Sequence, residues 1–431
     1  MRAFVRSKVV GVCFCILTVA PAVVAHAAAG ALDPSFSGNG KVTLQQGVED
    51  VAVQADGKIV AVGEYFGDFS LTRFDPDGTR DSKFGNHGVV HTPFRTGKGC
   101  FAVATSVLVQ PADQQIVVVG YSYCANGWFA VARYNTDGTL DPTFGHGGKV
   151  MTRFTAGGHT CSATPAAAAL QSDGKILAAG RIGKTCPWKF AVARYDMGGS
   201  LDTTFSGDGR VATDITPFVD QAEGIAVQSD GSIVVAGTAA LGRDESYDER
   251  MAVVRYLPHG RLDPSFGKGG KATANFQGES TCHPAEGHAV ALQPNGRIVV
   301  AGVAGCGFPE MALARFTAAG HIDASFGGNG KVVTELTKND CESEAFAVAV
   351  LPDRRIVAGG AAGCRSPAFG LARYLPHGAL DRTFGNAGVV TTLFPSQQDY
   401  EWVSGIALQQ DGKIVAGGNA LTGRLVRYLG A

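Results

Sequence analysis

The sequence has little charge and lacks the short motifs that would assign a function directly. Asp, Glu, Lys and Arg make up 17% of the 431 residues, and the formal net charge is −1. There is no basic run and no interleaving of basic and aromatic residues, so we expect no nucleic-acid partner. No H-E-x-x-H, G-x-S-x-G or phosphate-binding loop motif occurs. We therefore assign no catalytic residue, metal ligand or cofactor from motifs.

Long apolar runs and helical periodicity are also lacking beyond the N-terminus. No later stretch approaches the roughly 18 apolar residues of a membrane-spanning helix, so no span is expected. Residues 1–27 have the three parts of a secretory signal: a basic start, an apolar core over 9–20, and the small-x-small site Ala25-His26-Ala27. We expect cleavage there, and a mature protein that is secreted, periplasmic or on the cell surface. Residues 31–431 are expected to form a single domain.

The dominant feature of the sequence is a repeat that occurs seven times. Each copy begins with a version of L-D-x-[ST]-F-[GS]-x-x-G, passes through x-D-G-K-I-V-V-A-G, and ends on a triplet similar to A-R-Y. A near-constant period of this length is the signature of a repeat architecture. The opening aspartates follow one another at intervals of 48 to 61 residues: Asp33, Asp81, Asp141, Asp202, Asp263, Asp323 and Asp381.

Each repeat contains four short strand signals. An Asp-Gly or Asn-Gly dipeptide, a strong hairpin signal, separates the second strand from the third in five repeats. Glycine supplies 59 of the 431 residues, which suits a protein with many tight turns. A parallel β-helix would have shorter coils without tight hairpins. We therefore predict an all-β fold, a seven-bladed β-propeller of four-stranded antiparallel blades.

The order of strands within a blade is predicted from polarity. The second strand, for example over 347–351, is almost continuously apolar, as expected if it lies innermost and is covered on both faces. The first strand, for example over 331–334, is more polar and is expected at the outer edge, completing the blade of the preceding repeat. Residues 41–44 must then pair with residues 425–428, which closes the ring.

Cysteine spacing predicts four disulfides. Outside the signal region, eight cysteines form couples 23 to 25 residues apart, and each couple brackets the central turn of one repeat. Residues equidistant from a hairpin turn face each other, so the couples should lie within disulfide reach. A metal site, the rival interpretation, would bring closer spacings such as C-x-x-C. The couples are Cys100 with Cys124, Cys161 with Cys186, Cys282 with Cys306, and Cys341 with Cys364.

A second constant spacing predicts structural ion pairs. The arginine that ends each fourth strand precedes the next opening aspartate by eight residues, with a turn midway between them. We expect each pair to bond through two parallel N–H···O contacts. The last arginine and the first aspartate lack sequence neighbours and should pair with each other. The expected pairs are Arg73 with Asp81, Arg133 with Asp141, Arg194 with Asp202, Arg255 with Asp263, Arg315 with Asp323, Arg373 with Asp381, and Arg427 with Asp33.

The repeat motif resembles a known family. Leu140-Asp141-Pro142-Thr143-Phe144-Gly145, followed by Asp173-Gly174-Lys175-Ile176 and Ala193-Arg194-Tyr195, is similar to the delta-60 repeats of bacterial secreted proteins. The resemblance covers all of the expected mature chain in seven tandem copies. It implies a β-propeller in an exported or cell-surface protein, and it brings no catalytic residues to this chain.

Candidate ligand-binding residues lie where the repeats differ, because a site rarely needs seven copies. Four carboxylates near the start of the second strand could form part of a ring around the channel mouth and hold a cation or sugar hydroxyls: Glu49, Glu223, Glu286 and Glu344. Asp399, Tyr400 and Trp402 combine acidic and aromatic groups, as carbohydrate sites do. Solvated loop charges and an ordinary strand entry are the alternatives. His283 and His288 fit no usual zinc spacing.

These observations predict a binding or scaffold module, expected to be a monomer, that docks a glycan or protein partner at one face of the ring. The alternative is a polysaccharide hydrolase or lyase whose acid and base are carboxylates at the channel mouth. Hydrolysis would need two carboxyl groups held about 5–9 Å apart.

Overall fold

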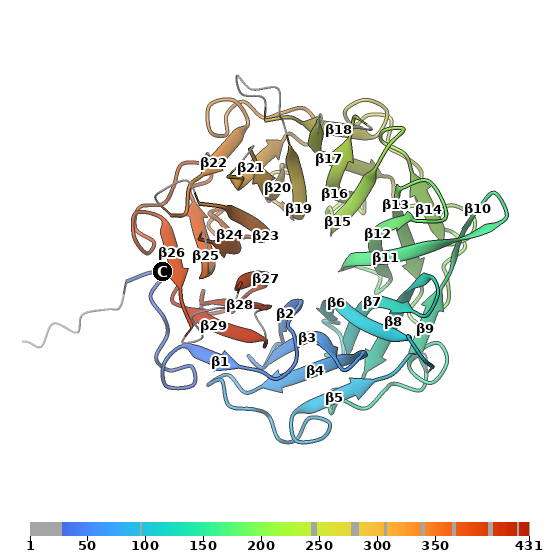
Figure 1. Cartoon of the computed structure of the whole chain (residues 1–431), viewed down its shortest axis with the longest axis horizontal. Helices are drawn as coiled ribbons and strands as arrows, with labels where there is room; N and C mark the ends of the chain where they lie inside the picture. The colour runs from blue at the N-terminus through green and yellow to red at the C-terminus, as the bar shows by residue number, and fades with distance from the viewer. Residues whose placement is uncertain are drawn as a thin grey trace, which may run out of the picture.

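The computed structural model describes residues 28–94, 97–242, 248–276, 284–305, 308–337, 341–363, 368–394, 400–419 and 422–430. In these ranges the chain forms 29 β-strands and no helix. Seven separate sheets stand around a central axis (Figure 1). Each sheet is one blade, and its strands lie side by side in order from the centre outwards. The predicted seven-bladed β-propeller is confirmed. No helix in the described residues is long and apolar enough to cross a membrane.

Blades 1 to 3 use the first part of the chain. Blade 1 consists of β2 (Asp50–Val53), β3 (Ile59–Tyr65), β4 (Asp68–Phe74) and β5 (Val89–Thr92). Blade 2 consists of β6 (Phe101–Val109), β7 (Ile116–Tyr123), β8 (Gly127–Tyr134) and β9 (Lys149–Thr152). Blade 3 consists of β11 (His159–Leu170), β12 (Ile176–Gly183), β13 (Lys189–Tyr195) and β14 (Arg210–Thr213), and also carries β10 (Phe154–Ala156) as a fifth strand.

Blades 4 to 7 follow the four-stranded plan. Blade 4 consists of β15 (Asp220–Val227), β16 (Ile233–Ala240), β17 (Glu249–Tyr256) and β18 (Lys271–Ala274). Blade 5 consists of β19 (Ala285–Leu292), β20 (Ile298–Ala304), β21 (Glu310–Phe316) and β22 (Lys331–Thr334). Blade 6 consists of β23 (Ser343–Val350), β24 (Ile356–Ala362), β25 (Ala368–Tyr374) and β26 (Val389–Thr392). Blade 7 consists of β27 (Trp402–Leu408), β28 (Ile414–Asn419), β29 (Arg424–Tyr428) and β1 (Lys41–Thr43).

The two ends of the chain meet in blade 7. Strand β1 pairs antiparallel with β29, with Lys41 opposite Val426 and Thr43 opposite Arg424. A further bridge joins Leu32 to Tyr428. The predicted closure is therefore confirmed, and the ring is held shut by the same backbone hydrogen bonds that hold each blade.

Burial within a blade differs in one respect from the prediction. The second strand of each repeat is innermost, as expected (Figure 1). It is not covered on both faces, however, because part of its length borders the central channel and stays half-exposed, as in β19. The fully buried strands are the next two outwards, such as β20 and most of β21. The apolar cores lie between neighbouring blades, where these strands pack face to face.

One face of the ring carries all seven arginine–aspartate pairs, and we call it the arginine face. In each pair Nε of the arginine lies 2.8–2.9 Å from Oδ2 of the aspartate. Arg427 and Asp33 form the seventh pair across the ring closure, with side chains only 4% and 5% exposed. The expected two parallel contacts are not formed. In the Arg133 pair, Nη2 shares Oδ2 with Nε, while Oδ1 of Asp141 accepts from the hydroxyl of Thr143 at 2.7 Å.

Each arginine of the arginine face also joins two blades. Nη1 of Arg255, for example, donates to the carbonyl of Ala318 in the next blade at 2.6 Å. The guanidinium lies over the phenylalanine that follows its aspartate, 4.6 Å from the Phe266 ring centroid. Phe84 is fully buried, and a Cβ on Gly138 of the next blade (φ +90°) would come within 2.9 Å of its ring. The residues of the repeated motif therefore pack neighbouring blades against each other.

The opposite face, which we call the mouth face, carries the loops from the third to the fourth strand of a repeat, such as those from β3 to β4 and from β7 to β8, and both described disulfides. Cys100 bonds to Cys124 with Cα atoms 4.2 Å apart, and Cys161 bonds to Cys186 with Cα atoms 5.4 Å apart. Cys341 is also disulfide-bonded. Its expected partner Cys364, and the expected pair of Cys282 and Cys306, lie outside the described residues.

Candidate functional site

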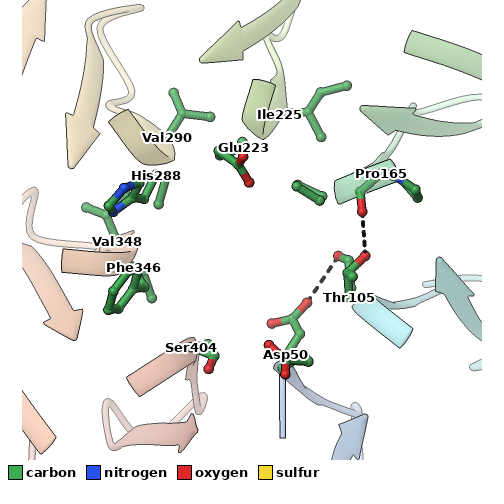
Figure 2. Close-up of a pocket in the computed structure, with 18 of the residues that line it drawn as sticks. Asp50, Thr105, Pro165, Glu223, Ile225, His288, Val290, Phe346, Val348 and Ser404 are labelled. Atoms are coloured by element: carbon green, nitrogen blue, oxygen red, sulfur yellow. Dashed lines mark hydrogen bonds between the residues drawn. The ribbon is translucent and has the colours of Figure 1, made fainter. Parts of the chain in front are cut away.

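A cavity of about 590 Å³ lies at the centre of the ring, where all seven innermost strands meet. Figure 2 shows side chains from separate blades pointing into this space. The cavity has polar groups around it and an apolar belt formed by Ile225, Val290, Val348 and Ile406. Polar side chains over apolar walls are the usual make-up of a small-molecule site.

A β-bulge in the innermost strands sets which residues reach the cavity. In six blades one residue interrupts the register between this strand and its neighbour, for example between Ala222 and Gly224 in β15. Such a bulge re-aims a side chain, and it recurs at the same repeat position. Alignment of the repeats places Glu49 at this position in blade 1. The seven bulge-position residues all line the cavity: Glu49, Thr105, Ala166, Glu223, His288, Phe346 and Ser404.

His288 is the most constrained member of this set. Its Nδ1 lies 3.0 Å from the carbonyl oxygen of Ala345, its Nε2 lies 3.3 Å from Oε2 of Glu286, and its ring stacks on Phe346. Burial opposes protonation, but the hydrogen bond and charge of Glu286 outweigh it and raise the pKa of His288. In turn, the hydrogen bond from His288 lowers the pKa of Glu286. Each member of this pair therefore stabilises the charged form of the other.

Glu223 and Arg181 form a second charged pair. Arg181 Nη1 lies 3.7 Å from Oε1 of Glu223 and also donates to Gln221. Burial nevertheless raises the pKa of Glu223, against the lowering effect of Arg181. Glu223 and Glu286 thus occupy neighbouring blades with pKa values displaced in opposite directions.

Glu49 and Asp50 supply the carboxylates of blade 1. Glu49 accepts a hydrogen bond from Asn419 at 2.8 Å, and burial raises its pKa. Asp50, labelled in Figure 2, accepts from the hydroxyl of Ser106 at 3.1 Å. It also accepts from the backbone N–H of Val107 at 2.9 Å. Burial raises the pKa of Asp50 to about 6. Asp50 therefore links blades 1 and 2 at the channel wall.

The structure brings together only part of the set proposed from the sequence. Glu49, Glu223, Glu286 and Trp402 line the cavity. Glu344 is not among the lining residues, although its charge contributes to the raised pKa of His288. Tyr400 is 45% exposed and packs edge-on against Trp402, 5.8 Å between centroids. Asp399 lies outside the described residues.

Sequence reasoning missed the bulge. Glu223 stands at the bulge position of its blade, whereas Glu286 stands two residues before the bulge position of its own, so these two carboxylates do not occupy equivalent places in the repeat. The bulge position could have been found from its spacing, because in six of the repeats it lies five residues before the glutamine of the central turn. Applied to every repeat, this spacing selects Thr105, His288, Phe346 and Ser404. Within the described residues no group of three His, Cys, Asp or Glu side chains could hold a metal ion.

Comparison with family models matches six segments of the chain to a β-propeller domain of unknown function, DUF5122. The segments are residues 54–84, 112–144, 171–205, 228–266, 293–326 and 351–384. These matches support a β-propeller repeat family for the chain, with no function attached to it. A comparison with curated proteins found no match.

The solved structures that are similar to this chain share little sequence identity with it. A protein of unknown function from Dyadobacter fermentans is 12% identical, covering 90% of this chain and 98% of its own, with a TM-score of 0.43. Sqt1 from Chaetomium thermophilum, bound to the N-terminus of ribosomal protein L10, is 10% identical, covering 89% and 97%, with a TM-score of 0.47. The propeller domain of the trilobed protease from Pyrococcus furiosus is 10% identical, covering 90% and 95%, with a TM-score of 0.43. Likenesses of this size carry no argument about what the chain binds.

Proposed function

We propose that this protein is a β-propeller binding module whose central cavity takes a ligand bearing hydroxyl or amino groups. One observation carries the proposal: the seven bulge-position residues surround a single cavity, and six different residue types occupy those equivalent positions. Packing needs would favour the same residue in every blade, as they do at the arginine face. Variation among equivalent positions around a cavity is expected where a ligand without sevenfold symmetry is bound.

The charges around the cavity favour a hydrogen-bond donor as the ligand. Glu49, Glu223 and Glu286 present carboxylate oxygens, which only accept hydrogen bonds when ionised. Phe346 and Trp402 add aromatic surface on the side of blades 6 and 7. A sugar ring or an amine with an apolar body presents donors and an apolar face together, so it matches both parts of the wall.

Calorimetric titration tests this proposal. The probes are calcium chloride, neutral cello-oligosaccharides and amino-sugar oligomers, each added to the wild type and to the variants Glu223→Gln and Glu286→Gln. The matched control is Glu335→Gln, an exposed carboxylate outside the cavity. We expect at least one probe to bind, and both cavity variants to weaken it by about tenfold while the control does not. Absence of binding by all three probes, or equal loss in the control, contradicts the proposal.

A polysaccharide hydrolase or lyase is the second candidate, and the opposite pKa displacements of Glu223 and Glu286 favour it. Two carboxyl groups whose environments displace their pKa values in opposite directions are what acid–base catalysis needs. Product release from the same oligosaccharides separates the two functions. Loss of turnover in Glu223→Gln with binding retained identifies an enzyme, whereas loss of binding without any turnover identifies a binding module.

We further propose that the chain is of the delta-60 type, that residues 1–27 are a cleaved signal peptide, and that residues 31–431 act outside the cytoplasm as a monomer. The disulfides support this location, since they persist in oxidising compartments. N-terminal sequencing of the exported protein and its mass in solution test these points. A mature chain that begins at residue 1, or a stable dimer, contradicts them.

A further inference from the structure

The mouth face is electrostatically divided. In the stretches 97–128 and 149–189, which include the mouth loops of blades 2 and 3, the only acidic residues are Asp113 and Asp173, and both lie in turns on the arginine face. Asp214, at the mouth end of β14, is paired with Lys189 at 2.8 Å. Most acidic residues of the mouth face lie in blades 4 to 6 instead, among them Glu223, Glu249, Glu286, Glu342 and Glu344. We call the mouth side of blades 2 and 3 the basic sector. Its excess of positive charge attracts an anionic partner.

Cations and aromatic rings are paired within the basic sector. Lys184 lies over the ring of Tyr123, 5.2 Å from its centroid, and donates to its hydroxyl at 2.7 Å. Arg153 lies over Trp128 at 4.4 Å. Arg181 lies over Trp188 at 5.5 Å. Among the described residues no carboxylate pairs with Lys184 or Arg153, and both side chains are exposed.

The pairs belong to one surface rather than to separate loops. Lys184 follows β12 in blade 3 but reaches Tyr123 at the end of β7 in blade 2, and Phe101 packs on Tyr123 with centroids 5.3 Å apart. Phe101 is 38% exposed despite its size. These strands are neighbours on one side of the ring (Figure 1). We call this surface the aromatic–basic rim, formed by Phe101, Tyr123, Trp128, Arg153, Lys184 and Trp188.

We propose that the aromatic–basic rim binds a carboxylated polysaccharide. A uronate residue has an apolar ring face, which packs on an aromatic side chain, and a carboxylate, which accepts charge-assisted hydrogen bonds from lysine or arginine. A cation held over an aromatic ring presents both partners together. Three such units along blades 2 and 3 match a polymer that repeats this chemistry. Because Arg181 also lines the cavity, the rim leads to the channel mouth.

The test titrates oligomers of polygalacturonate into the wild type and the double variant Arg153→Gln/Lys184→Gln. The control is Arg261→Gln/Lys268→Gln, which removes the same two residue types from exposed positions on the arginine face. We expect the rim variant to weaken binding about tenfold and the control to leave it unchanged. Rising salt should weaken wild-type binding, since the contacts are ionic. Phe101→Ala should also weaken binding, with thermal unfolding showing that each variant is folded.

Neutral dextran and poly-glutamate provide the remaining arms. The proposal expects no binding of dextran and weaker binding of poly-glutamate, which has the charge without the sugar ring. Failure of polygalacturonate to bind the wild type overturns the proposal, as does equal affinity in the rim variant. Poly-glutamate binding as tight as polygalacturonate, and equally sensitive to the rim variant, would show that the rim recognises an acidic peptide instead.

Discussion

The two ends of the propeller use the same repeat in opposite ways. On the arginine face an arginine, an aspartate and a phenylalanine recur in every repeat, and each set of three is buried between two blades. At the cavity the equivalent positions hold Glu, Thr, Ala, His, Phe and Ser. The repeats therefore keep the same residues where neighbouring blades touch and vary them where the surface faces the open cavity. Changes at the arginine face should therefore alter stability, and changes at the cavity should alter binding.

The largest effect is expected from the ring-closing ion pair. Replacing Arg427 with alanine leaves the carboxylate of Asp33 buried beside fewer donors, which should lower the free energy of unfolding by about 3–5 kcal/mol. Denaturation with guanidinium chloride measures the change. The internal pair variant Arg194→Ala is the matched control and should lose a similar amount. A loss below about 1 kcal/mol in both would put these pairs among ordinary surface bridges.

Removal of a disulfide should have a large effect on stability even though the disulfides lie on the mouth face. The double variant Cys161→Ser/Cys186→Ser removes a cross-link between cysteines that are 25 residues apart in sequence. This should lower the free energy of unfolding by about 3 kcal/mol. The melting temperature of the wild type under reducing conditions provides the control. Binding at the cavity should survive in the folded fraction. If binding is lost while the fold persists, the disulfide positions the site as well.

The arginine face should lose stability only in strong acid. Burial alone would raise the pKa of Asp141, but hydrogen bonds from Thr143 and the Arg133 guanidinium outweigh it and lower the pKa to about 2. Asp381 behaves in the same way, with a pKa of about 2. A lowered folded-state pKa contributes stability that is complete above the unfolded value near 3.8 and is lost as pH falls towards 2. Each should contribute about 2 kcal/mol.

Thermal unfolding between pH 5 and pH 2 measures this loss, and the variant Asp141→Asn supplies the control. The asparagine variant should be less stable than the wild type at neutral pH, and the gap should narrow as the pH falls. A gap that stays constant across this range would contradict the assignment.

The smallest effect is expected at the cavity. The raised pKa of Glu223 means that its charge is disfavoured in the folded state, so stability rises as the pH falls through its folded-state pKa. Glu223→Gln removes that cost and also a half-exposed bridge to Arg181, so the free energy of unfolding at pH 7 should change by less than about 1 kcal/mol. A large destabilisation would show that the cavity carboxylates hold the blades together, as the arginine–aspartate pairs do on the arginine face.

Much of the fold was predictable because its causes are local and repeated. The eight-residue spacing from Arg373 to Asp381 implies a contact across a turn, and the absence of a partner for Arg427 implies the closing pair. The form of the contact was not predictable. Oδ1 of each aspartate is taken by the hydroxyl or backbone two residues later, a competition that depends on the turn geometry.

The cavity was harder to predict for a physical reason. A single-residue bulge shifts which side chain faces inwards, and nothing in the polarity of β19 or β15 marks where the shift falls. The sequence therefore indicated carboxylates near the mouth without separating Glu223 from Glu286. The cation–aromatic pairs of the rim join loops of different strands, such as Lys184 and Tyr123, which no local pattern relates.

The pairing of β1 with β29 has a consequence for the order of events in folding. Blades 1 to 6 are each built from a continuous run of sequence and need only local contacts. Blade 7 is complete only when residues 424–428 pair with β1, a strand almost four hundred residues earlier in the sequence. Without that pairing the ring is an open arc with unpaired edges at both ends, and closing it needs a contact of high sequence separation, a kind that forms slowly.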